Sequence, residues 1–206
     1  MIKAIVFDMG GVLVDLDMQA CIRAFKERAG FSDIEDILDC CHQKGIIASL
    51  EGGDFTEEEF IEAALGHCRP GTTAEDVREC FCALLPGLPQ YKADLLNELK
   101  REYDLYILSN NNPITVRHSG RLFAAAGAPY ESTFKHLFIS CDLKLLKPGA
   151  AIFRHVIDSI GCRPDEILFI DDSHLNVDAA AALGIRSVFY DPTKDDLRDT
   201  VRDALQ

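Results

Sequence analysis

Residues 3–8 read KAIVFD, a continuous run of apolar, β-branched and aromatic residues that ends in an acid. A run without polar alternation is typical of a strand buried on both faces of a parallel sheet. Four later segments show the same pattern, the last of them more weakly: 104–109 (DLYILS), 166–171 (EILFID), 186–190 (RSVFY) and 136–140 (HLFIS). The sequence therefore predicts five strands, with Asp8 at the carboxyl end of the first.

Helical stretches separate these strands. The ranges 91–101, 150–160 and 176–183 have helical periodicity, and Gly161 and Gly184 follow the last two as helix stops. Strands that alternate with helices predict an α/β fold built on a right-handed, doubly wound parallel sheet. Ligands of such sheets bind at the carboxyl ends of the strands.

The segment 17–85 interrupts the alternation. It contains no convincing strand and shows helical periodicity, and residues 56–59 (TEEE) form a capping box that opens a helix. The turn at 86–89 (PGLP) marks the return to the strand and helix pattern. We therefore expect a catalytic core formed by residues 1–16 and 86–206, and a small inserted helical domain formed by residues 17–85.

The charge limits the possible partners. Thirty-four acidic and 21 basic residues give a net charge of −13, which repels nucleic acid and anionic lipid, so we expect neither nucleic acid nor a membrane as partner. Any phosphate site must then be locally electropositive, through a metal, a lysine or backbone amides. The acidic tail, 195–203, is expected to be the solvated face of a helix. Nothing in the sequence sets the oligomeric state.

The amino terminus and the cysteines indicate the compartment. The chain passes directly from Met1 into the first apolar run, and no stretch approaches the roughly 20 apolar residues of a membrane-spanning helix, so we expect a cytoplasmic protein. The eight cysteines contain no CxxC pair. Although Cys40-Cys41-His42 and His67-Cys68 could offer soft ligands, we expect reduced cysteines that act as small core hydrophobes, not a zinc site.

Acids end two of the expected strands. Asp8 is followed by MGGV at 9–12, where glycines allow backbone amides to turn toward an anion; a plain turn-capping aspartate is the alternative. Asp171 and Asp172 end another apolar strand, where adjacent carboxylates are costly unless a cation holds them. Magnesium suits such oxygen ligands. The alternative is an exposed acidic turn that caps the helix from Asn176.

Two further segments could bind phosphate. Ser109 opens the run SNNN, which offers hydroxyl, amide and backbone donors, although polar turns of this kind are common. Lys147 precedes Pro148 and the helix expected from about residue 150, and could be aimed back toward the strand ends. A single lysine is more often exposed to solvent, so this assignment depends on the other three segments.

Taken in order, FDMGGVLVD, LSNNN, KLLKPGAAIF and LFIDDSHLNVDAAAALGI resemble the four motifs of the haloacid dehalogenase (HAD) superfamily, and they span nearly the whole chain. The resemblance implies a Rossmann-like sheet, with the helical insertion as the cap that many of these enzymes carry. It also implies a Mg²⁺-dependent phosphatase that acts on a small phosphorylated metabolite through an aspartyl-phosphate.

The resemblance further implies a role for each matching residue. Asp8 would be the nucleophile and, with its other oxygen, a metal ligand. The carbonyl of Gly10 and the carboxylate of Asp172 would complete the metal site, and Asp171 would bind directly or through water. Asn176 would support these ligands from behind. The phosphoryl group would be held by Met9 and Gly10 of the nucleophile loop together with Ser109, Asn110 and Lys147.

One position departs from the family pattern. Most phosphatases of this superfamily carry a second aspartate, the general acid and base, where this chain has Gly10. General acid and base catalysis contributes about 10² to 10⁴ in rate. The pattern most resembles the branch of the α-D-glucose-1-phosphate phosphatases, whose anomeric leaving group needs less help. Candidate replacement acids are Asp15, Asp17, His118 and Glu51, although each could equally be a plain surface residue.

Two other functions fit the same motifs. A 2-haloacid dehalogenase uses a similar aspartate without a metal, but Asp171 and Asp172 would then repel its carboxylate substrate. A non-catalytic binding protein could have kept the fold and lost turnover with the acid at Gly10. Loss of one proton-transfer group lowers a rate without removing the nucleophile, the metal or the phosphate clamp, so an enzyme remains the favoured interpretation.

Overall fold

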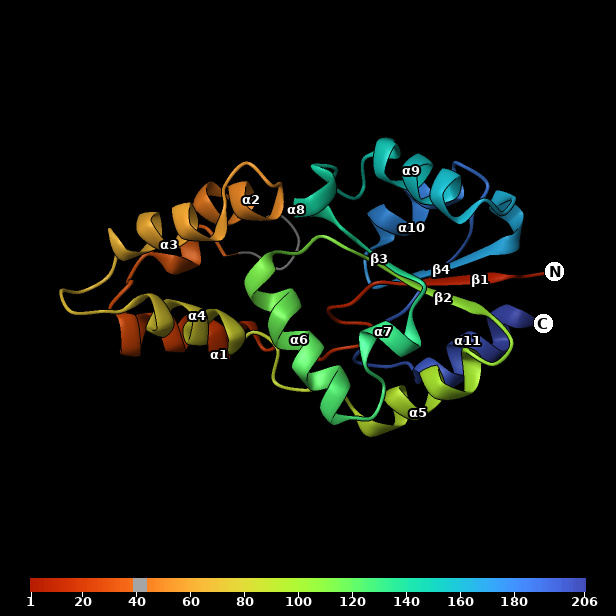
Figure 1. Ribbon diagram of the computed structural model, residues 1–206, viewed down its shortest axis with the longest axis horizontal. Helices are drawn as coiled ribbons and strands as arrows, with labels where there is room; N and C mark the ends of the chain where they lie inside the picture. Colours follow the sequence, from red (N-terminus) through yellow and green to blue (C-terminus); the bar gives the residue numbers. More distant parts are fainter. Residues whose placement is uncertain (39–43) are drawn as a thin grey trace.

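The computed structural model describes residues 1–38 and 44–206. At its centre lies a parallel sheet of five strands in the order β3-β2-β1-β4-β5 (Figure 1). The strands are β1 (Ala4–Phe7), β2 (Asp104–Ser109), β3 (His136–Ile139), β4 (Ile167–Asp171) and β5 (Arg186–Phe189). The predicted α/β fold is confirmed, and every strand lies within one residue of its predicted ends.

Helices cover both faces of this sheet (Figure 1). A short helix, α8 (Ser140–Leu143), follows β3, and a 3-10 turn, Pro164–Glu166, precedes β4. One face packs against α5 (Gln90–Leu99), α6 (Pro113–Ala125), α7 (Tyr130–Thr133) and α11 (Leu197–Leu205), and the other against α9 (Ala150–Ile160) and α10 (His174–Ala181).

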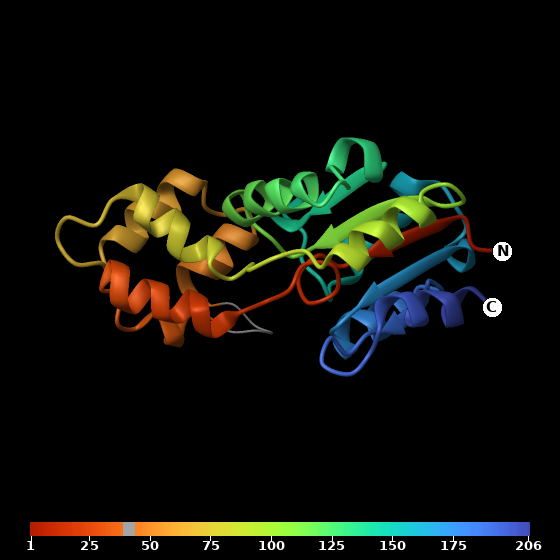
Figure 2. The ribbon, with the colours of Figure 1, turned by 90° about the horizontal axis from the view of Figure 1, so that it is seen from below.

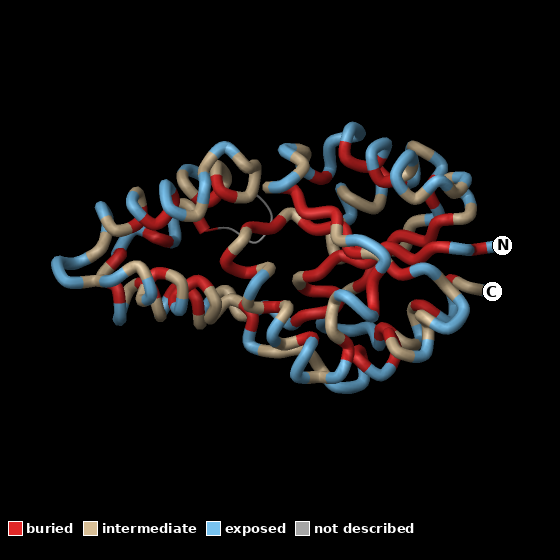
Figure 3. The backbone as a smooth tube through the Cα atoms, in the orientation of Figure 1, coloured by how far each residue is buried: buried red, intermediate tan, exposed pale blue. Residues whose placement is uncertain are grey.

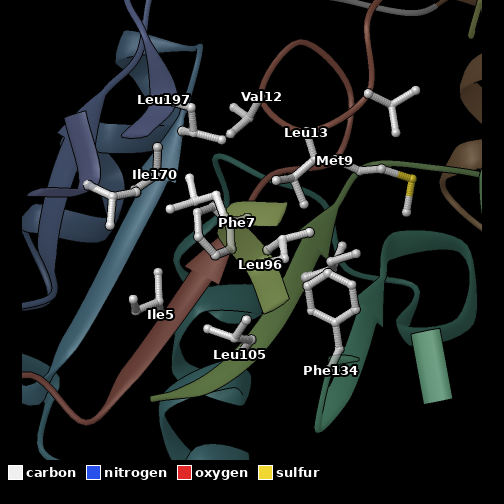
Figure 4. Close-up of a cluster of buried hydrophobic side chains, with 14 of the residues drawn as sticks. Ile5, Phe7, Met9, Val12, Leu13, Leu96, Leu105, Phe134, Ile170 and Leu197 are labelled. Carbon is white, nitrogen blue, oxygen red and sulfur yellow. The ribbon is translucent and has the colours of Figure 1, made fainter. Parts of the chain in front are cut away.

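The position of β1 explains why its sequence is apolar throughout. Successive side chains of a strand point to opposite faces, so Ile5 and Phe7 join the cluster that packs against α5 and α11, while Ala4 and Val6 join the cluster under α9. Figure 4 shows Ile5 and Phe7 in the first of these clusters. The fully buried β1 therefore sets Asp8, the next residue, at the carboxyl edge of the sheet.

The regular elements among the described residues of segment 17–85 are all helices, joined by turns and loops, and we call this segment the cap. Its apolar side chains form a second core, separate from those of the sheet, with buried residues along the inner sides of its helices (Figure 3). The elements are α1 (Met18–Arg23), a π-helical continuation (Ala24–Ala29), a 3-10 turn (Ile34–Asp36), α2 (Gly45–Glu51), α3 (Glu57–Leu65) and α4 (Ala74–Cys82). The division at residues 16/17 and 85/86 stays a prediction.

Two linkers run side by side between the cap and the core (Figure 2). The Asp15 amide donates to the carbonyl of Gly87 at 3.0 Å, and the Asp17 amide donates to the carbonyl of Leu84 at 2.9 Å. The side chain of Asp17 also accepts from the amide of Ala20 and so caps α1. Paired in this way, the linkers restrict where the cap can lie.

Helix α6 of the core also holds the cap. Its Ile114 side chain is buried within the apolar cluster of the cap. One turn later, both terminal nitrogens of Arg117 donate to the Glu57 carboxylate of α3 at 2.9 Å. Because α6 follows directly on the SNNN segment after β2, the same stretch of chain contributes to the sheet edge and to the cap.

Several local predictions can be compared with the structure. The capping box at residues 56–59 is confirmed, since the Thr56 and Glu59 side chains each accept from the other residue's amide. The tail prediction is confirmed for its acidic residues, which are all exposed. α11 does lie there, but one face of it is buried through Leu197, Val201 and Ala204, whose spacing of four and three residues places them on one side. Helices α6, α7 and α8 were not predicted.

The cysteines of the described residues are all free, and Cys21 and Cys80 are fully buried in the cap. Their environment agrees with the prediction of small core hydrophobes. The candidate ligand group Cys40-Cys41-His42 lies outside the described residues. None of the described helices is long and apolar enough to cross a membrane.

Replacing Ile114 by alanine should lower the free energy of unfolding by about 2 to 5 kcal/mol, because it removes a buried side chain and leaves a cavity between α6 and the cap. Urea denaturation would measure the loss. Leu175→Ala is the control, since that leucine is 55% exposed and should change stability by about 0.5 kcal/mol at most. Equal effects of the two substitutions would contradict the packing described for Ile114.

Candidate active site

The site is built at the carboxyl edge of β1 and β4. Phe7 pairs with Ile170 in the parallel register, so Asp8 and Asp171 follow at the same level on adjacent strands. The Asp8 amide donates to the carbonyl of Ile170 at 2.9 Å and ties the first residue of the loop to β4. Ser109 ends β2 on the other side of β1. Parallel pairing therefore brings three of the predicted residues to one edge.

Lys147 lies between the two acids. Its ammonium group is 2.9 Å from Asp8 Oδ1, 2.6 Å from Asp171 Oδ2 and 2.9 Å from the carbonyl oxygen of Leu108. Burial alone would lower the pKa of this lysine, but the charges of Asp171 and Asp8 outweigh it and raise the pKa. Lys147 is therefore a buried cation that bridges the ends of β1 and β4. The sequence predicted that its side chain points back toward the strand ends, as it does.

Asp171 is held on both oxygens. Besides the Lys147 contact at Oδ2, its Oδ1 accepts from the Ser173 amide at 2.8 Å and from the Asn176 side-chain amide at 2.9 Å. Asn176 thus lies directly behind this carboxylate, where the prediction put it. A fully buried acid with these partners has a fixed orientation.

Asp8, Asp171 and Asp172 together form a group that could hold a metal. One oxygen from each of them lies within 4.8 Å of the others. Burial raises the pKa of Asp8 to about 6, an effect that Lys147 opposes and Asp171 reinforces. Burial, with the charges of Asp8 and Asp171, raises the pKa of Asp172 to about 7. Three acids face one lysine, so the donor set fits a divalent cation that prefers oxygen ligands, such as Mg²⁺.

The loop after Asp8 is shaped around this group. The Met9 amide donates to Asp8 Oδ1 at 2.7 Å, and the Met9 carbonyl accepts from the amides of Leu13 and Val14. Gly11 has a φ of +80°, and a Cβ atom on it would lie 2.1 Å from Asp172 Oδ2. The sequence predicted that the glycines form a phosphate-binding turn. It did not predict that residue 11 must be glycine to leave space for the Asp172 carboxylate. The Gly10 carbonyl stays a predicted metal ligand.

The SNNN segment does more than offer donors. The side-chain amide of Asn110 is committed to the backbone of Lys147, donating to its carbonyl and accepting from its amide at 2.9 Å each. Asn110 therefore positions Lys147, and its backbone amide and the second N–H of its side chain are the donors that it could offer to the predicted phosphate contact. Asn112 caps α6 through the amides of Ile114 and Thr115. An asparagine before Pro113 is a helix-start signal that could have revealed α6 from the sequence.

The four candidate replacement acids have different environments. Asp15 pairs with the buried Lys92 at 3.6 Å, and Asp17 caps α1. His118 has its Nε2 atom 3.0 Å from the carbonyl oxygen of Leu85. Glu51, at the end of α2, is partly buried, and the negative charge of Asp8 contributes to raising its pKa. Of the four, Glu51 is the residue whose pKa is raised in part by the charge of Asp8.

A Gly11→Ala substitution should weaken Mg²⁺ binding about 10- to 100-fold, because the new methyl group would displace the Asp172 carboxylate. Isothermal titration calorimetry would measure the affinity. Gly127→Ala is the matched control: its φ of +79° imposes the same backbone strain, but no atom lies within 4 Å of the added carbon. Equal affinities of the two variants would contradict the assignment of Asp172 to the metal.

Comparisons with known proteins identify the family. The haloacid dehalogenase-like hydrolase family matches residues 2–184. The chain is 32% identical over 188 residues to a D-ribitol-5-phosphate phosphatase of Bacteroides thetaiotaomicron, covering 91% of each protein.

Two solved structures are similar over nearly the whole chain. A mutant HAD family enzyme of Bacteroides thetaiotaomicron, in complex with magnesium and inorganic phosphate, has a TM-score of 0.90 at 32% identity, covering 95% of this chain and 96% of that one. A predicted HAD-like hydrolase of Porphyromonas gingivalis has a TM-score of 0.90 at 33% identity, covering 100% and 98%. These matches agree with the predicted superfamily. The chain belongs to the haloacid dehalogenase-like hydrolase family.

Proposed function

We propose that this hydrolase is a magnesium-dependent phosphatase of small phosphorylated metabolites that acts through an aspartyl-phosphate on Asp8. The observation that carries the proposal is the convergence of Asp8, Asp171 and Asp172 on one point beside the buried Lys147. Relatives named as a phosphatase and as an enzyme bound to magnesium and phosphate agree with the predicted activity and metal.

Asp8 would attack phosphorus, and the other residues of the site would bind the phosphoryl group and neutralise its negative charge. A carboxylate oxygen of Asp8 attacks phosphorus, and Lys147 offsets the negative charge of both the nucleophile and the phosphoryl oxygens. Ser109 and the backbone amides of the nucleophile loop and of Asn110 bind the remaining oxygens. Magnesium, held by Asp8, Asp172, the Gly10 carbonyl and Asp171 directly or through water, would neutralise charge as the phosphoryl group is transferred. Water then hydrolyses the acyl phosphate and regenerates Asp8.

The substrate class follows from the surroundings of the site. The cap lies next to the carboxyl edge of the sheet, and a net charge of −13 disfavours polyanions. A small phosphorylated metabolite fits both constraints. The relative named for D-ribitol 5-phosphate points to the ester of a primary alcohol, whereas the glucose 1-phosphate preference stays a prediction from the motif pattern.

Replacing Asp8 by asparagine should abolish Mg²⁺-dependent release of p-nitrophenol from p-nitrophenyl phosphate, because the amide cannot attack phosphorus. We expect a loss of at least about 10³-fold in kcat/KM, the scale on which removal of a nucleophile acts. Asp158→Asn, on the exposed side of α9, is the isosteric control and should keep full activity. A wild-type protein that is inactive at every Mg²⁺ concentration would instead support a non-catalytic binding protein.

Magnesium should raise the melting temperature more at pH 8 than at pH 5. Asp8 and Asp172 have pKa values raised to about 6 and 7, so metal-free folding loses stability as pH rises from about 4, the unfolded pKa, through these values. The cation removes that penalty. At a Mg²⁺ concentration a hundredfold above the Kd at pH 8, used at both pH values, we expect a rise of about 5 to 10 °C at pH 8 and less than half of that at pH 5.

Differential scanning fluorimetry with and without Mg²⁺ would measure these shifts. Subtracting the metal-free melting temperature at each pH isolates the site from the other titrating groups of the protein. Asp172→Asn should show a small shift at both pH values. A shift of equal size at pH 5 and pH 8 in the wild-type protein would contradict the metal assignment.

A further inference from the structure

The proposed phosphatase lacks an evident proton donor beside its nucleophile. An alkoxide is a poor leaving group, so the ester of a primary alcohol needs a proton on its leaving oxygen as the P–O bond breaks. Gly10 has no side chain to give one. The space next to it is taken by Leu16, whose side-chain carbon lies 3.1 Å from where a Cβ atom of residue 10 would be. The proton must come from elsewhere.

We propose that Glu51, at the carboxyl end of α2 in the cap, is the general acid and base of this site. The inference rests on the proposed phosphatase function and adds a catalytic residue to it. Asp15, Asp17 and His118 have structural partners, as described above. Glu51 instead lies against the end of the sheet: Ser140, whose hydroxyl accepts from the Asn111 amide of the SNNN segment, donates to its carbonyl oxygen, and the Asn112 side chain lies next to its carboxyl group.

The environment of Glu51 suits a proton donor. Burial raises its pKa to about 8; the Asn112 side-chain amide opposes this shift, and the negative charge of Asp8 adds to it. The carboxyl group therefore carries its proton at neutral pH, which an exposed glutamate would not. Elevated values of this kind are the means by which a carboxyl group serves as an acid near pH 7.

Two contacts with α8 hold the end of α2 near the carboxyl edge of the sheet. The Ser140 hydroxyl of α8 donates to the carbonyl oxygen of Glu51 at 2.6 Å. Two residues later, Gly53 has a φ of +75°, and a Cβ atom there would lie 2.2 Å from the carbonyl oxygen of Cys141. The cap therefore touches α8 backbone to backbone, and Figure 1 shows the end of α2 beside α8. Glu51 is fixed by the core and by the cap together.

Glu51 would donate a proton when the phosphoryl group is transferred to Asp8 and would recover one when the acyl phosphate is hydrolysed. As an Asp8 oxygen forms its bond to phosphorus, the electron pair of the P–O ester bond moves to the leaving oxygen, which takes the proton of Glu51 and departs as an alcohol. Glu51 is then a carboxylate. It takes a proton from the water that attacks the acyl phosphate, while the electron pair of the P–O bond to Asp8 returns to that carboxylate.

The test compares leaving groups in Glu51→Gln, an isosteric variant that cannot transfer a proton. With p-nitrophenyl phosphate, whose leaving group needs no acid, kcat/KM should fall less than about tenfold. With D-ribitol 5-phosphate, a primary alkyl ester, it should fall about 10² to 10⁴-fold. Because the loss of a base also slows hydrolysis of the acyl phosphate, rapid mixing should show a burst of p-nitrophenol equal to the enzyme concentration.

Glu58→Gln, on the exposed surface of α3, is the matched control and should leave both substrates unaffected. An unchanged melting temperature of Glu51→Gln would show that the variant folds. Equal losses with the two substrates would assign Glu51 a structural role and overturn the proposal, as would a wild-type enzyme that hydrolyses aryl but no alkyl phosphates. Absence of aryl phosphatase activity in the wild-type protein would overturn the proposed function itself, so the two failures are distinguishable.

A second variant tests whether the function lost in Glu51→Gln is proton donation. Gly10→Asp places a carboxyl group two residues after the nucleophile, where the only close obstacle is the flexible side chain of the 44%-exposed Leu16. In the Glu51→Gln background it should restore alkyl phosphate hydrolysis at least about tenfold without a matching gain with the aryl substrate. A double variant no better than Glu51→Gln with the alkyl ester would count against the proposal.

Discussion

A buried lysine between two buried acids is the interaction on which the site depends. Lys147 contacts Asp8 and Asp171 at 2.9 and 2.6 Å, and its positive charge offsets the negative charge of these two carboxylates in a buried, low-dielectric environment. One ammonium group cannot balance three acids, however, because Asp172 adds a third charge to the group. Lys147 is thus a fixed cation of the site, and the proposed Mg²⁺ would be a second, exchangeable one. The electropositive patch that an acidic protein needs to receive phosphate is assembled from both.

Backbone hydrogen bonds and chain connectivity link the motifs at the carboxyl edge of the sheet to one another and to the cap. Asn110 clamps the chain at Lys147 with two hydrogen bonds, and Lys147 in turn reaches the ends of β1, β2 and β4. Directly after Asn110 the chain enters α6, which buries Ile114 in the cap and pairs Arg117 with Glu57. A single stretch of about eight residues therefore sets the position of both the phosphate site and the cap, so neither can move far without the other.

The sequence predicted the strands and the convergence of Asp8, Asp171 and Asp172 at one edge, because both depend on local pattern. A strand buried on both faces must be apolar throughout, and parallel pairing then brings the acids after β1 and β4 together without further information. It did not predict the contact of Gly11 with Asp172 or the docking of α2 on α8. These contacts join residues about 90 to 160 positions apart, and α8 has only four residues, too few for a periodic signal.

The location of the proposed acid changes what the cap does. A carboxyl group in the nucleophile loop would face the leaving oxygen whether or not the cap covered the site. A carboxyl group on α2 faces it only while the end of α2 contacts Ser140 and Asn112. The docked cap would then both supply the proton and exclude bulk water, so that an ester with a poor leaving group reacts in the covered site. Gly10 has no side chain and the Leu16 side chain beside it is apolar, so neither could donate the proton in place of a residue of the cap.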